Sequence, residues 1–258
     1  ACVSSYEDEE RFVNIFNYEE NPLLKKYDVI VVSPGVKLLG NQLITHFIMN
    51  RTLIISELDL GFMFCRGKVI GITGTNGKTT VTSLTGEIFK KAGKKTFVCG
   101  NIGLPICSIA EKTDKNSFII CEVSNFQLEG SKYFNADEVC ILNLAPDHID
   151  RHGTFEEYVR VKSKIISNKG SQKVVLNFDD NLVNSLKKSK KIMYFSKKIL
   201  NKGVFLKNNA IYHNKTKIIS MNDIPLFGEK NLENVMAATA LAVGYKIKPT
   251  VIRNAILG

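Results

Sequence analysis

A glycine-rich stretch carries the clearest chemical signal in the sequence. Residues 71–80 read Gly-Ile-Thr-Gly-Thr-Asn-Gly-Lys-Thr-Thr, between an apolar run and a helical pattern. Glycines let backbone N–H groups approach phosphate oxygens, and the start of a helix adds partial positive charge. Lys78 could reach the β- and γ-phosphates of a nucleotide, and the Thr79 hydroxyl could bind Mg²⁺. We expect a nucleotide-binding loop rather than a chance glycine-rich turn, although the strict pattern has glycine where this chain has Ile72.

Titratable side chains follow two further apolar runs. Glu122 stands near the end of the run Ser117–Val123, where a carboxylate could hold the Mg²⁺ of a nucleotide or take part in a buried ion pair. The segment 143–152 reads Asn-Leu-Ala-Pro-Asp-His-Ile-Asp-Arg-His and follows another run. Ligands bind at the carboxyl edge of an open α/β sheet, so both places are candidates for an active site. A polar surface turn is the competing interpretation of the segment 143–152.

Lys162 lies on the apolar stretch of a helix that we predict over Phe155–Asn168. A lysine in such a place is normally a surface residue, whose stem lies along apolar neighbours while its ammonium reaches water. Spacing alone gives Lys162 no role in chemistry.

The elements that must position these residues alternate between strand and helix. This alternation predicts an α/β fold of the P-loop type, with a mostly parallel sheet and helices on both faces. Over Gly203–Ile219, short runs with turns at 208–209 and 213–214 predict a small antiparallel sheet. The predicted strands are Lys26–Ser33, Arg51–Ser56, Gly67–Ile72, Thr96–Cys99, Ser117–Val123, Glu138–Asn143, Lys173–Asn177 and Lys191–Phe195. The predicted helices are a short one after Ser56 and those over Lys78–Ala92, Phe155–Asn168, Asn231–Val243 and Pro249–Leu257.

Composition excludes several classes of protein. The 258 residues are 44% hydrophobic and 23% charged, and no apolar run approaches the roughly 20 residues that cross a bilayer, which excludes global disorder and a membrane-spanning helix. Most of the net charge of +10 comes from 11 lysines against two aspartates between Gly170 and Lys217. No nucleic-acid-binding motif accompanies them, so a solvated face is the preferred interpretation. Six cysteines without CxxC spacing favour a reduced, cytoplasmic protein.

Several distinctive stretches occur together in this chain: Gly71–Thr80, Gly100–Pro105, Glu122–Glu129, Asp147–Arg151 with Lys162–Ile165, and Gly228–Asn234. In this combination they resemble the Mur ligase family. The loop and the Asp-His segment are similar to those of all Mur ligases and of folylpolyglutamate synthases. The stretch 122–129 and the tripeptide Ser33-Pro34-Gly35 resemble more narrowly the members that add D-glutamate. Two positions depart from the family's pattern, since Asn125 stands at a usual Ser and Lys230 at a usual His.

The resemblance implies roles for the matching residues, with Lys78, His148 and Lys162 as the catalytic ones. For ATP the matching residues are Gly74, Thr75, Asn76, Gly77, Lys78, Thr79 and Thr80, with Asn231 and Asn234 at the adenine. For two Mg²⁺ ions they are Thr79 with Glu122, and His148 with a carbamoylated Lys162. For the muramoyl part of a nucleotide-sugar they are Asn101, Ser124 and Gln127, and for its uracil end Ser33, Pro34 and Gly35. CO₂ addition would convert the lysine ammonium, which cannot bind a cation, into an anionic oxygen ligand.

By the same resemblance, the activity is that of an ATP-dependent amide ligase of peptidoglycan precursor synthesis. It would join D-glutamate to UDP-N-acetylmuramoyl-L-alanine through an acyl phosphate, as a cytoplasmic monomer without nucleic acid or membrane insertion. Residues 1–66 would be part of an N-terminal Rossmann-like UDP-binding domain and residues 67–258 the central ATP-binding domain, with the family's C-terminal domain absent and full turnover therefore not expected. The alternatives are another Mur ligase, a folylpolyglutamate-type ligase, or a regulatory module that binds a nucleotide without making a bond.

Overall fold

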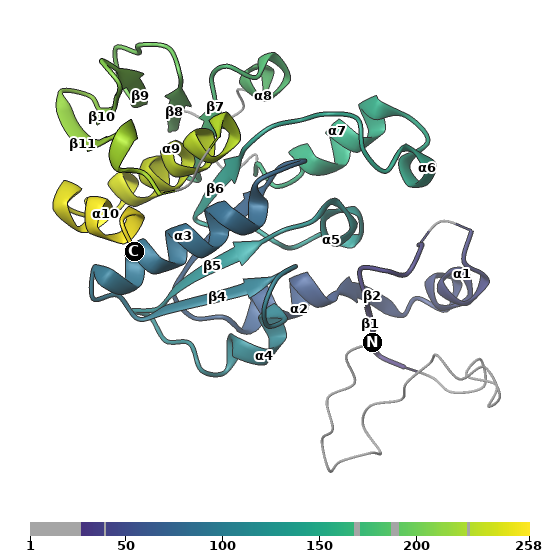
Figure 1. Ribbon diagram of the computed structural model, residues 1–258. Helices are drawn as coiled ribbons and strands as arrows, with labels where there is room; N and C mark the ends of the chain where they lie inside the picture. The colour runs from purple at the N-terminus through teal and green to yellow at the C-terminus, as the bar shows by residue number, and fades with distance from the viewer. Residues whose placement is uncertain (1–26, 39, 168–170, 187–190, 226–227) are drawn as a thin grey trace.

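The computed structural model describes residues 27–38, 40–167, 171–186, 191–225 and 228–258, whose strands form two sheets (Figure 1). The strands are β1 (Val29–Val32), β2 (Leu53–Ser56), β3 (Lys68–Thr73), β4 (Thr96–Gly100), β5 (Phe118–Glu122), β6 (Glu138–Ile141), β7 (Lys173–Asn177), β8 (Ile192–Ser196), β9 (Val204–Lys207), β10 (Ala210–His213) and β11 (Thr216–Ser220). The helices are α1 (Gln42–Met49), α2 (Glu57–Phe64), α3 (Lys78–Lys91), α4 (Ile106–Ala110), α5 (Asn125–Gly130), α6 (Ile149–His152), α7 (Phe155–Ser163), α8 (Asn181–Ser185), the 3₁₀ turn Met221–Asp223, α9 (Glu229–Gly244) and α10 (Pro249–Ile256).

The larger sheet has nine strands in the order β11-β10-β9-β8-β7-β6-β3-β5-β4. All pairs from β4 to β9 are parallel, which confirms the predicted mostly parallel sheet. The strands β9, β10 and β11 are antiparallel, as predicted, with turns at 208–209 and after His213. They extend the parallel sheet instead of forming a separate one, because Phe195 and Ser196 of β8 pair with Val204 and Phe205 of β9.

Both faces of the larger sheet are buried by helices (Figure 1). Ile120 and Cys140 pack with α3, α9 and α10 on one face. Their neighbours Ile119 and Val139 pack with α2, α4, α5 and α7 on the other. Successive strand residues point to opposite faces, so a strand covered on both sides is apolar throughout. The predicted placement of helices on both faces is confirmed.

The two-stranded sheet pairs β1 with β2 in parallel, and α1 covers one of its faces. α2 leads from β2 to β3 and begins at Ser56, whose hydroxyl accepts a hydrogen bond from the backbone N–H of Asp59. The Asp59 carboxylate accepts three backbone N–H bonds from residues 132–134 and one from the Ser131 hydroxyl. Burial alone would raise the pKa of Asp59, but these hydrogen bonds outweigh burial and lower it. Asp59 thereby ties α2 to the loop after α5.

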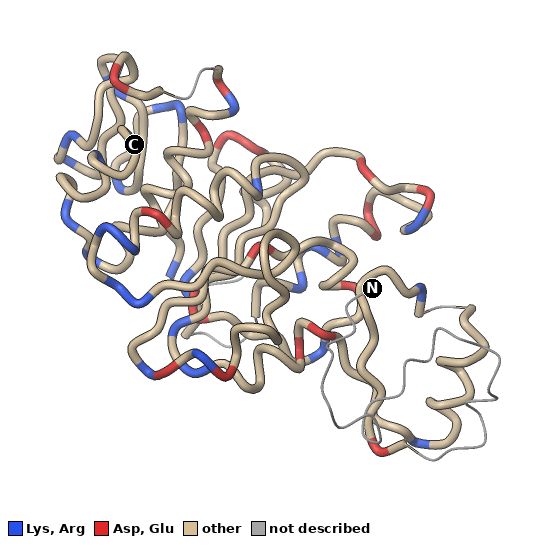
Figure 2. The backbone as a smooth tube through the Cα atoms, turned by 60° about the horizontal axis from the view of Figure 1, so that its bottom comes forward, with Lys and Arg blue, Asp and Glu red and all other residues tan. Residues whose placement is uncertain are grey.

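Lys, Arg, Asp and Glu residues occur along the whole described chain, with both signs interspersed (Figure 2). The lysines of the segment 170–217 that are exposed include Lys198, Lys202, Lys207, Lys215 and Lys217. Their exposure supports the interpretation of this segment as a solvated face. The cysteines among the described residues are all free, and Cys2 lies outside those residues. None of the described helices combines the length and apolar character of a membrane-spanning segment.

Several elements differ from the predictions at their ends. α7 ends at Ser163, and its predicted end at Asn168 lies outside the described residues. The predicted start of the first strand, Lys26, also lies outside the described residues. α9 begins at Glu229, two residues before its predicted start. The helices α1, α4, α5, α6 and α8 are absent from the sequence-based prediction. Each has eight residues or fewer, and so short a run carries little periodicity.

Glu138, at the amino end of β6, is a buried carboxyl group with little compensation. It is 2% exposed, and its Oε2 has no hydrogen-bond partner among the described residues. Lys173 approaches it, but the Lys173 ammonium donates to Gly244 O at 2.9 Å and lies 4.2 Å from the ring centre of Tyr245. Burial raises the pKa of Glu138 to about 8 despite the opposing charge of Lys173. The fold therefore prefers the neutral form of this side chain.

We predict that Glu138→Gln stabilises the fold at alkaline pH. The pKa of Glu138 is higher in the folded chain than its ordinary value of 4.5, so its contribution to stability is complete below that value and is lost as the pH rises toward about 8. Glutamine cannot ionise, and the gain at pH 8 should be on the order of 1–3 kcal/mol, with little gain at pH 4. Urea unfolding at several pH values measures this difference. The exposed variant Glu111→Gln is the control, and a gain that does not change with pH would contradict the prediction.

Candidate active site

Four adjacent strands, β6, β3, β5 and β4, end at one edge of the larger sheet, and the candidate residues follow them (Figure 1). In the parallel register, Ile72 of β3 lies opposite Glu122 of β5, and Glu122 lies opposite Gly100 of β4. The glycine-rich loop follows β3, and the segment that contains His148 follows β6. The sheet therefore gathers at one edge residues that are distant in sequence, where open α/β sheets bind ligands.

The loop between β3 and α3 is held by the segment after β6. Thr75 N–H donates to Asn143 O at 3.0 Å, and Asn76 N–H donates to Asn143 Oδ1 at 2.8 Å. Asn143 Nδ2 donates in return to Asn76 O at 3.0 Å. The Thr75 hydroxyl accepts from Ala145 N–H at 3.0 Å and lies 2.9 Å from the Tyr158 hydroxyl. Asn143 and Tyr158 thus shape the loop, which the sequence analysis did not anticipate.

Gly77 ends the loop and lies against α9. Its φ is 85°, and a Cβ atom at this position would overlap Asn234 Oδ1, so both the backbone conformation and the close packing require glycine. Asn234 Nδ2 donates to Asn231 Oδ1 at 3.2 Å. The two asparagines share one face of α9, as their spacing predicts, and Asn234 lies beside the start of α3.

Two lysine side chains meet at the carbonyl oxygen of Gly74. Lys78 Nζ and Lys162 Nζ each donate to this oxygen at 2.9 Å. Lys162 is 1% exposed, so it is not the surface residue that its spacing alone favours. Burial, and next the charge of Lys78, lower the pKa of Lys162 to about 7 against the opposing effect of two carboxylates. Burial also lowers the pKa of Lys78. The Lys162 amine is therefore largely uncharged above neutral pH.

Glu122 is a buried carboxylate that two neutral groups hold. Thr79 Oγ1 donates to its Oε2 at 3.0 Å, and Asn101 Nδ2 donates to its Oε1 at 2.8 Å. Neither donor is a cation, which disfavours the interpretation of Glu122 as half of an ion pair. The Thr79 hydroxyl and the Glu122 carboxylate lie next to each other in space and both offer oxygen atoms. Mg²⁺ prefers oxygen ligands. The two side chains therefore fit the Mg²⁺ that accompanies a nucleotide.

His148 begins α6 in a left-handed backbone conformation, with φ 50° and ψ 37°. Its exposed imidazole has Nε2 3.5 Å from Asp147 Oδ2, and its ring centre is 4.8 Å from that of Phe126. Within the described part of the chain, no three His, Cys, Asp or Glu side chains are grouped so that they could hold a metal ion. Among these four residue types, His148 therefore does not by itself complete a metal site, and an ion there would need further ligands such as water or substrate oxygens.

Ser124 and Gln127 form the capping box of α5. Gln127 N–H donates to Ser124 Oγ at 3.3 Å, and Ser124 N–H donates to Gln127 Oε1 at 2.9 Å. Between them, Asn125 Nδ2 donates to His152 Nε2 at 2.7 Å. Asn125, which departs from the family's pattern, thus has a hydrogen-bond partner in this chain. Lys230, the second departure, is exposed at the start of α9.

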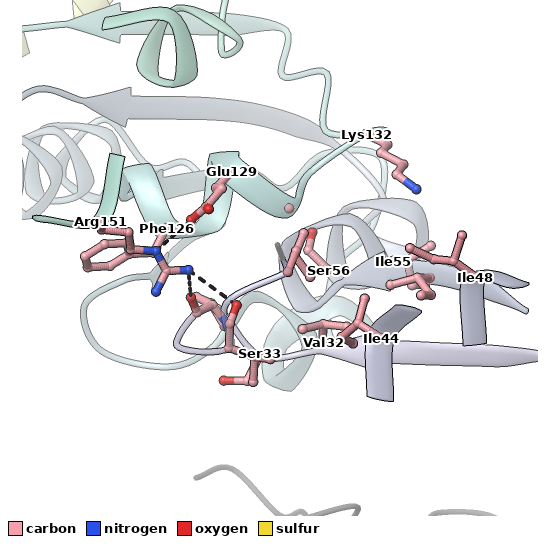
Figure 3. Close-up of a pocket in the computed structure, with 15 residues that line it drawn as sticks. Val32, Ser33, Ile44, Ile48, Ile55, Ser56, Phe126, Glu129, Lys132 and Arg151 are labelled. Atoms are coloured by element: carbon pink, nitrogen blue, oxygen red, sulfur yellow. Dashed lines mark hydrogen bonds and ion pairs between the residues drawn. The ribbon is translucent and has the colours of Figure 1, made fainter. Parts of the chain in front are cut away.

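Ser33, Pro34 and Gly35 belong to the turn after β1, which Val36 N–H closes by donating to Ser33 O at 3.0 Å. Ser33 and Pro34 border a pocket between the two-stranded sheet and α5 (Figure 3). Arg151 also lines this pocket, and the sequence analysis gave that arginine no role. The available signal was its place in the Asp-His segment, three residues after His148.

Residues 72–242 match the Mur ligase middle domain. The chain is 44% identical to a UDP-N-acetylmuramoylalanine–D-glutamate ligase of Alkaliphilus metalliredigens. The aligned region covers 86% of this chain and 50% of that protein. Ligases of the same name from Clostridioides difficile and Caldanaerobacter subterraneus subsp. tengcongensis are 42% and 40% identical, over 89% and 85% of this chain and 52% and 49% of theirs. The chain thus spans about half the length of the curated relatives it matches.

Solved structures share the fold at lower identity. A UDP-N-acetylmuramoyl-L-alanyl-D-glutamate–2,6-diaminopimelate ligase superposes with a TM-score of 0.66 at 17% identity, over 89% of this chain and 59% of that one. A UDP-N-acetylmuramate–alanine ligase of Thermotoga maritima superposes with a TM-score of 0.58 at 21% identity, over 89% and 54%. Because the middle-domain match covers more than half of its residues, the chain belongs to the Mur ligase family.

Proposed function

We propose that this chain contains the nucleotide-binding and sugar-nucleotide-binding parts of an ATP-dependent ligase that joins D-glutamate to UDP-N-acetylmuramoyl-L-alanine in peptidoglycan precursor synthesis. The observation that carries the proposal is the position of Glu122. One of its oxygens accepts from Thr79, at the nucleotide loop, and the other from Asn101, at the next strand end. One carboxylate thus lies between the ATP site and the proposed muramoyl site. The names of the relatives favour D-glutamate over other added groups.

The two sheets would divide the work of binding. Residues 67–258 would bind ATP, and residues 1–66, of which 1–26 lie outside the described residues, would contribute to the site for the uridine end of the substrate. Support comes from the turn of Ser33, Pro34 and Gly35, which follows the carboxyl end of β1. This is the edge at which parallel α/β sheets bind nucleotides.

ATP would lie along the loop from Gly74 to Thr80. The backbone N–H groups at the start of α3 and the ammonium of Lys78 would face its phosphates, which are stronger acceptors than the carbonyl groups that Lys78 contacts. Asn231 and Asn234 on α9 would lie at the adenine. Asn234 touches Gly77, so α9 is positioned directly by the loop.

Thr79 and Glu122 would hold one Mg²⁺ ion, and His148 with a carbamoylated Lys162 would hold a second. When bound, these ions would offset the negative charge of the phosphates during phosphoryl transfer. Lys162 fits reaction with CO₂, because its buried amine has a pKa lowered by burial to about 7. The neutral nitrogen would attack the carbon of CO₂, and one N–H proton would leave to solvent, which gives an anionic carbamate.

The reaction proposed from this family membership has two steps. The substrate carboxylate attacks the γ-phosphorus of ATP and releases ADP, and the amine of D-glutamate then attacks the acyl carbon and displaces phosphate. In this chain, Lys78 would orient the transferred phosphoryl group, while Asn101, Ser124 and Gln127 would orient the muramoyl part. These positioning contributions belong to proximity and electrostatic stabilisation, the main sources of catalysis in phosphoryl transfer.

Binding of UDP-N-acetylmuramoyl-L-alanine, measured by calorimetry with and without Mg²⁺·ADP, tests the substrate assignment. A preference for this compound over UDP-N-acetylmuramate supports it. If the chain binds Mg²⁺·ADP but binds no sugar-nucleotide, the result would favour the regulatory nucleotide module instead. In a chain extended by the family's C-terminal domain, ADP release that depends on D-glutamate separates the proposed ligase from a sister Mur ligase or a folylpolyglutamate-type ligase.

Lys78→Ala should weaken Mg²⁺·ADP binding at least tenfold and leave the fold intact. The variant loses a charge-assisted hydrogen bond to phosphate, which is worth about 1.5–3 kcal/mol. Calorimetric titration measures the affinity, and circular dichroism checks the fold. Lys90→Ala, on the exposed far part of α3, is the matched control and should bind normally. An unchanged affinity in Lys78→Ala would contradict the assigned role.

Lys162→Met should abolish CO₂ capture without opening a large cavity. In ¹³C-bicarbonate at pH 8, the chain should give a carbamate resonance in its NMR spectrum, and the variant should lack it. Lys164→Ala, which removes an exposed lysine two residues away, should keep the resonance. In a chain extended by the family's C-terminal domain, added short carboxylates should restore part of the ligase activity lost in Lys162→Ala, because they supply an anionic oxygen ligand. A carbamate signal that survives in Lys162→Met would refute the assignment.

A further inference from the structure

We infer that Arg151 is a positioning residue that fastens the turn of residues 33–36 to the segment carrying His148, and so fixes where the sugar-nucleotide lies relative to the reacting groups. The identity of that ligand rests on the proposed function. The position of the turn does not, because it follows from contacts within this chain.

The Arg151 guanidinium contacts three consecutive carbonyl groups of the turn. Nη1 donates to Gly35 O at 3.3 Å, and Nη2 donates to Pro34 O at 3.4 Å and to Val36 O at 3.3 Å. On its other side, Nε donates to Glu129 Oε2 of α5 at 2.8 Å. A planar group with several fixed donors can join elements in this way, whereas a lysine ammonium carries its three donors on a single nitrogen.

These contacts exclude Arg151 as a direct ligand for substrate phosphate. Four hydrogen bonds already use its N–H groups, of which a guanidinium has five. The side chain is 13% exposed, and the carboxylate of Glu129, itself 19% exposed, balances its charge. A phosphate would have to compete with that carboxylate for a group that is almost fully used. Arg151 therefore acts through the turn that it holds.

The same arginine is connected to His148 by two short routes. Its backbone N–H donates to His148 O at 3.1 Å within α6. Its guanidinium carbon lies 4.6 Å from the ring centre of Phe126, and the Phe126 ring centre lies 4.8 Å from that of His148. The turn, Arg151, Phe126 and His148 thus form one continuous set of contacts. This set of contacts is the route by which the position of the turn would affect the position of the imidazole.

Arg151→Ala and Arg151→Lys, compared with Arg160→Ala, test this inference in the 258-residue chain. Arg160 is an exposed arginine of α7 that pairs with Glu157 on the same helix, so its removal controls for the loss of a positive charge. Three measurements are made on each variant: hydrogen exchange over residues 33–38, the affinity for UDP-N-acetylmuramoyl-L-alanine, and the affinity for Mg²⁺·ADP.

In Arg151→Ala, exchange over 33–38 and the dissociation constant for the sugar-nucleotide should each rise roughly tenfold, because several hydrogen bonds are lost, while Mg²⁺·ADP affinity stays within about twofold. Arg151→Lys should fall between this variant and the unmodified chain, and it also serves if the alanine variant does not fold. Millimolar guanidinium should restore slow exchange in Arg151→Ala, because it can occupy the place of the missing side-chain guanidinium group. Arg160→Ala should behave as the unmodified chain does.

Unchanged exchange over 33–38 in both Arg151 variants would overturn the inference. So would faster exchange with undiminished sugar-nucleotide affinity, or an equal loss of affinity for both ligands, which indicates general destabilisation. If the unmodified chain does not bind the sugar-nucleotide at all, the substrate assignment fails. The exchange measurement and its rescue by guanidinium then still decide whether Arg151 holds the turn.

Discussion

The parallel register of β3, β4 and β5 is the constraint on which the candidate site depends. Ile72 lies opposite Glu122, and Glu122 lies opposite Gly100, so the residues that follow these positions meet around one carboxylate. A slip of one residue in β5 would turn Glu122 to the other face of the sheet. The register is maintained by burial, since the alternating residues Ile119 and Ile120 pack into different cores. The apolar interior thus specifies the geometry of the polar edge.

Burial acts on two ionisable groups at opposite ends of the sheet in different ways. At the carboxyl edge, Lys162 donates to Gly74 O, and carboxylates nearby limit the fall of its pKa. At the amino edge, one oxygen of Glu138 has no hydrogen-bond partner within the described chain, and its pKa rises despite Lys173. The first group is buried but hydrogen-bonded, which suits the neutral amine that the proposed reaction of Lys162 with CO₂ requires. The burial of Glu138 costs free energy of folding, which the surrounding packing offsets.

Much of the architecture could be predicted from periodicity and turn chemistry. The loop at 71–80 and the carboxylate at Glu122 were recognisable because glycines or an acidic residue at the end of a predicted strand can be identified from the local sequence alone. The burial of Lys162 was not recognisable, because its spacing is equally that of a surface lysine and only the packing of α7 against the loop excludes water. Arg151 and Asn143 were missed as contacts for a similar reason. Their partners at 34–36 and 75–76 are set by tertiary structure rather than by sequence spacing.

The packing of Asn234 against Gly77 has a consequence for how the molecule folds. These two residues are far apart in the chain, so their approach closes a long loop and adds to the contact order, which slows folding. The glycine-rich loop gains its neighbour only when α9 has docked on α3. During synthesis, the loop emerges from the ribosome well before that helix. The proposed nucleotide site is therefore completed late, because a nascent chain that stops short of α9 has the glycine-rich loop without Asn234.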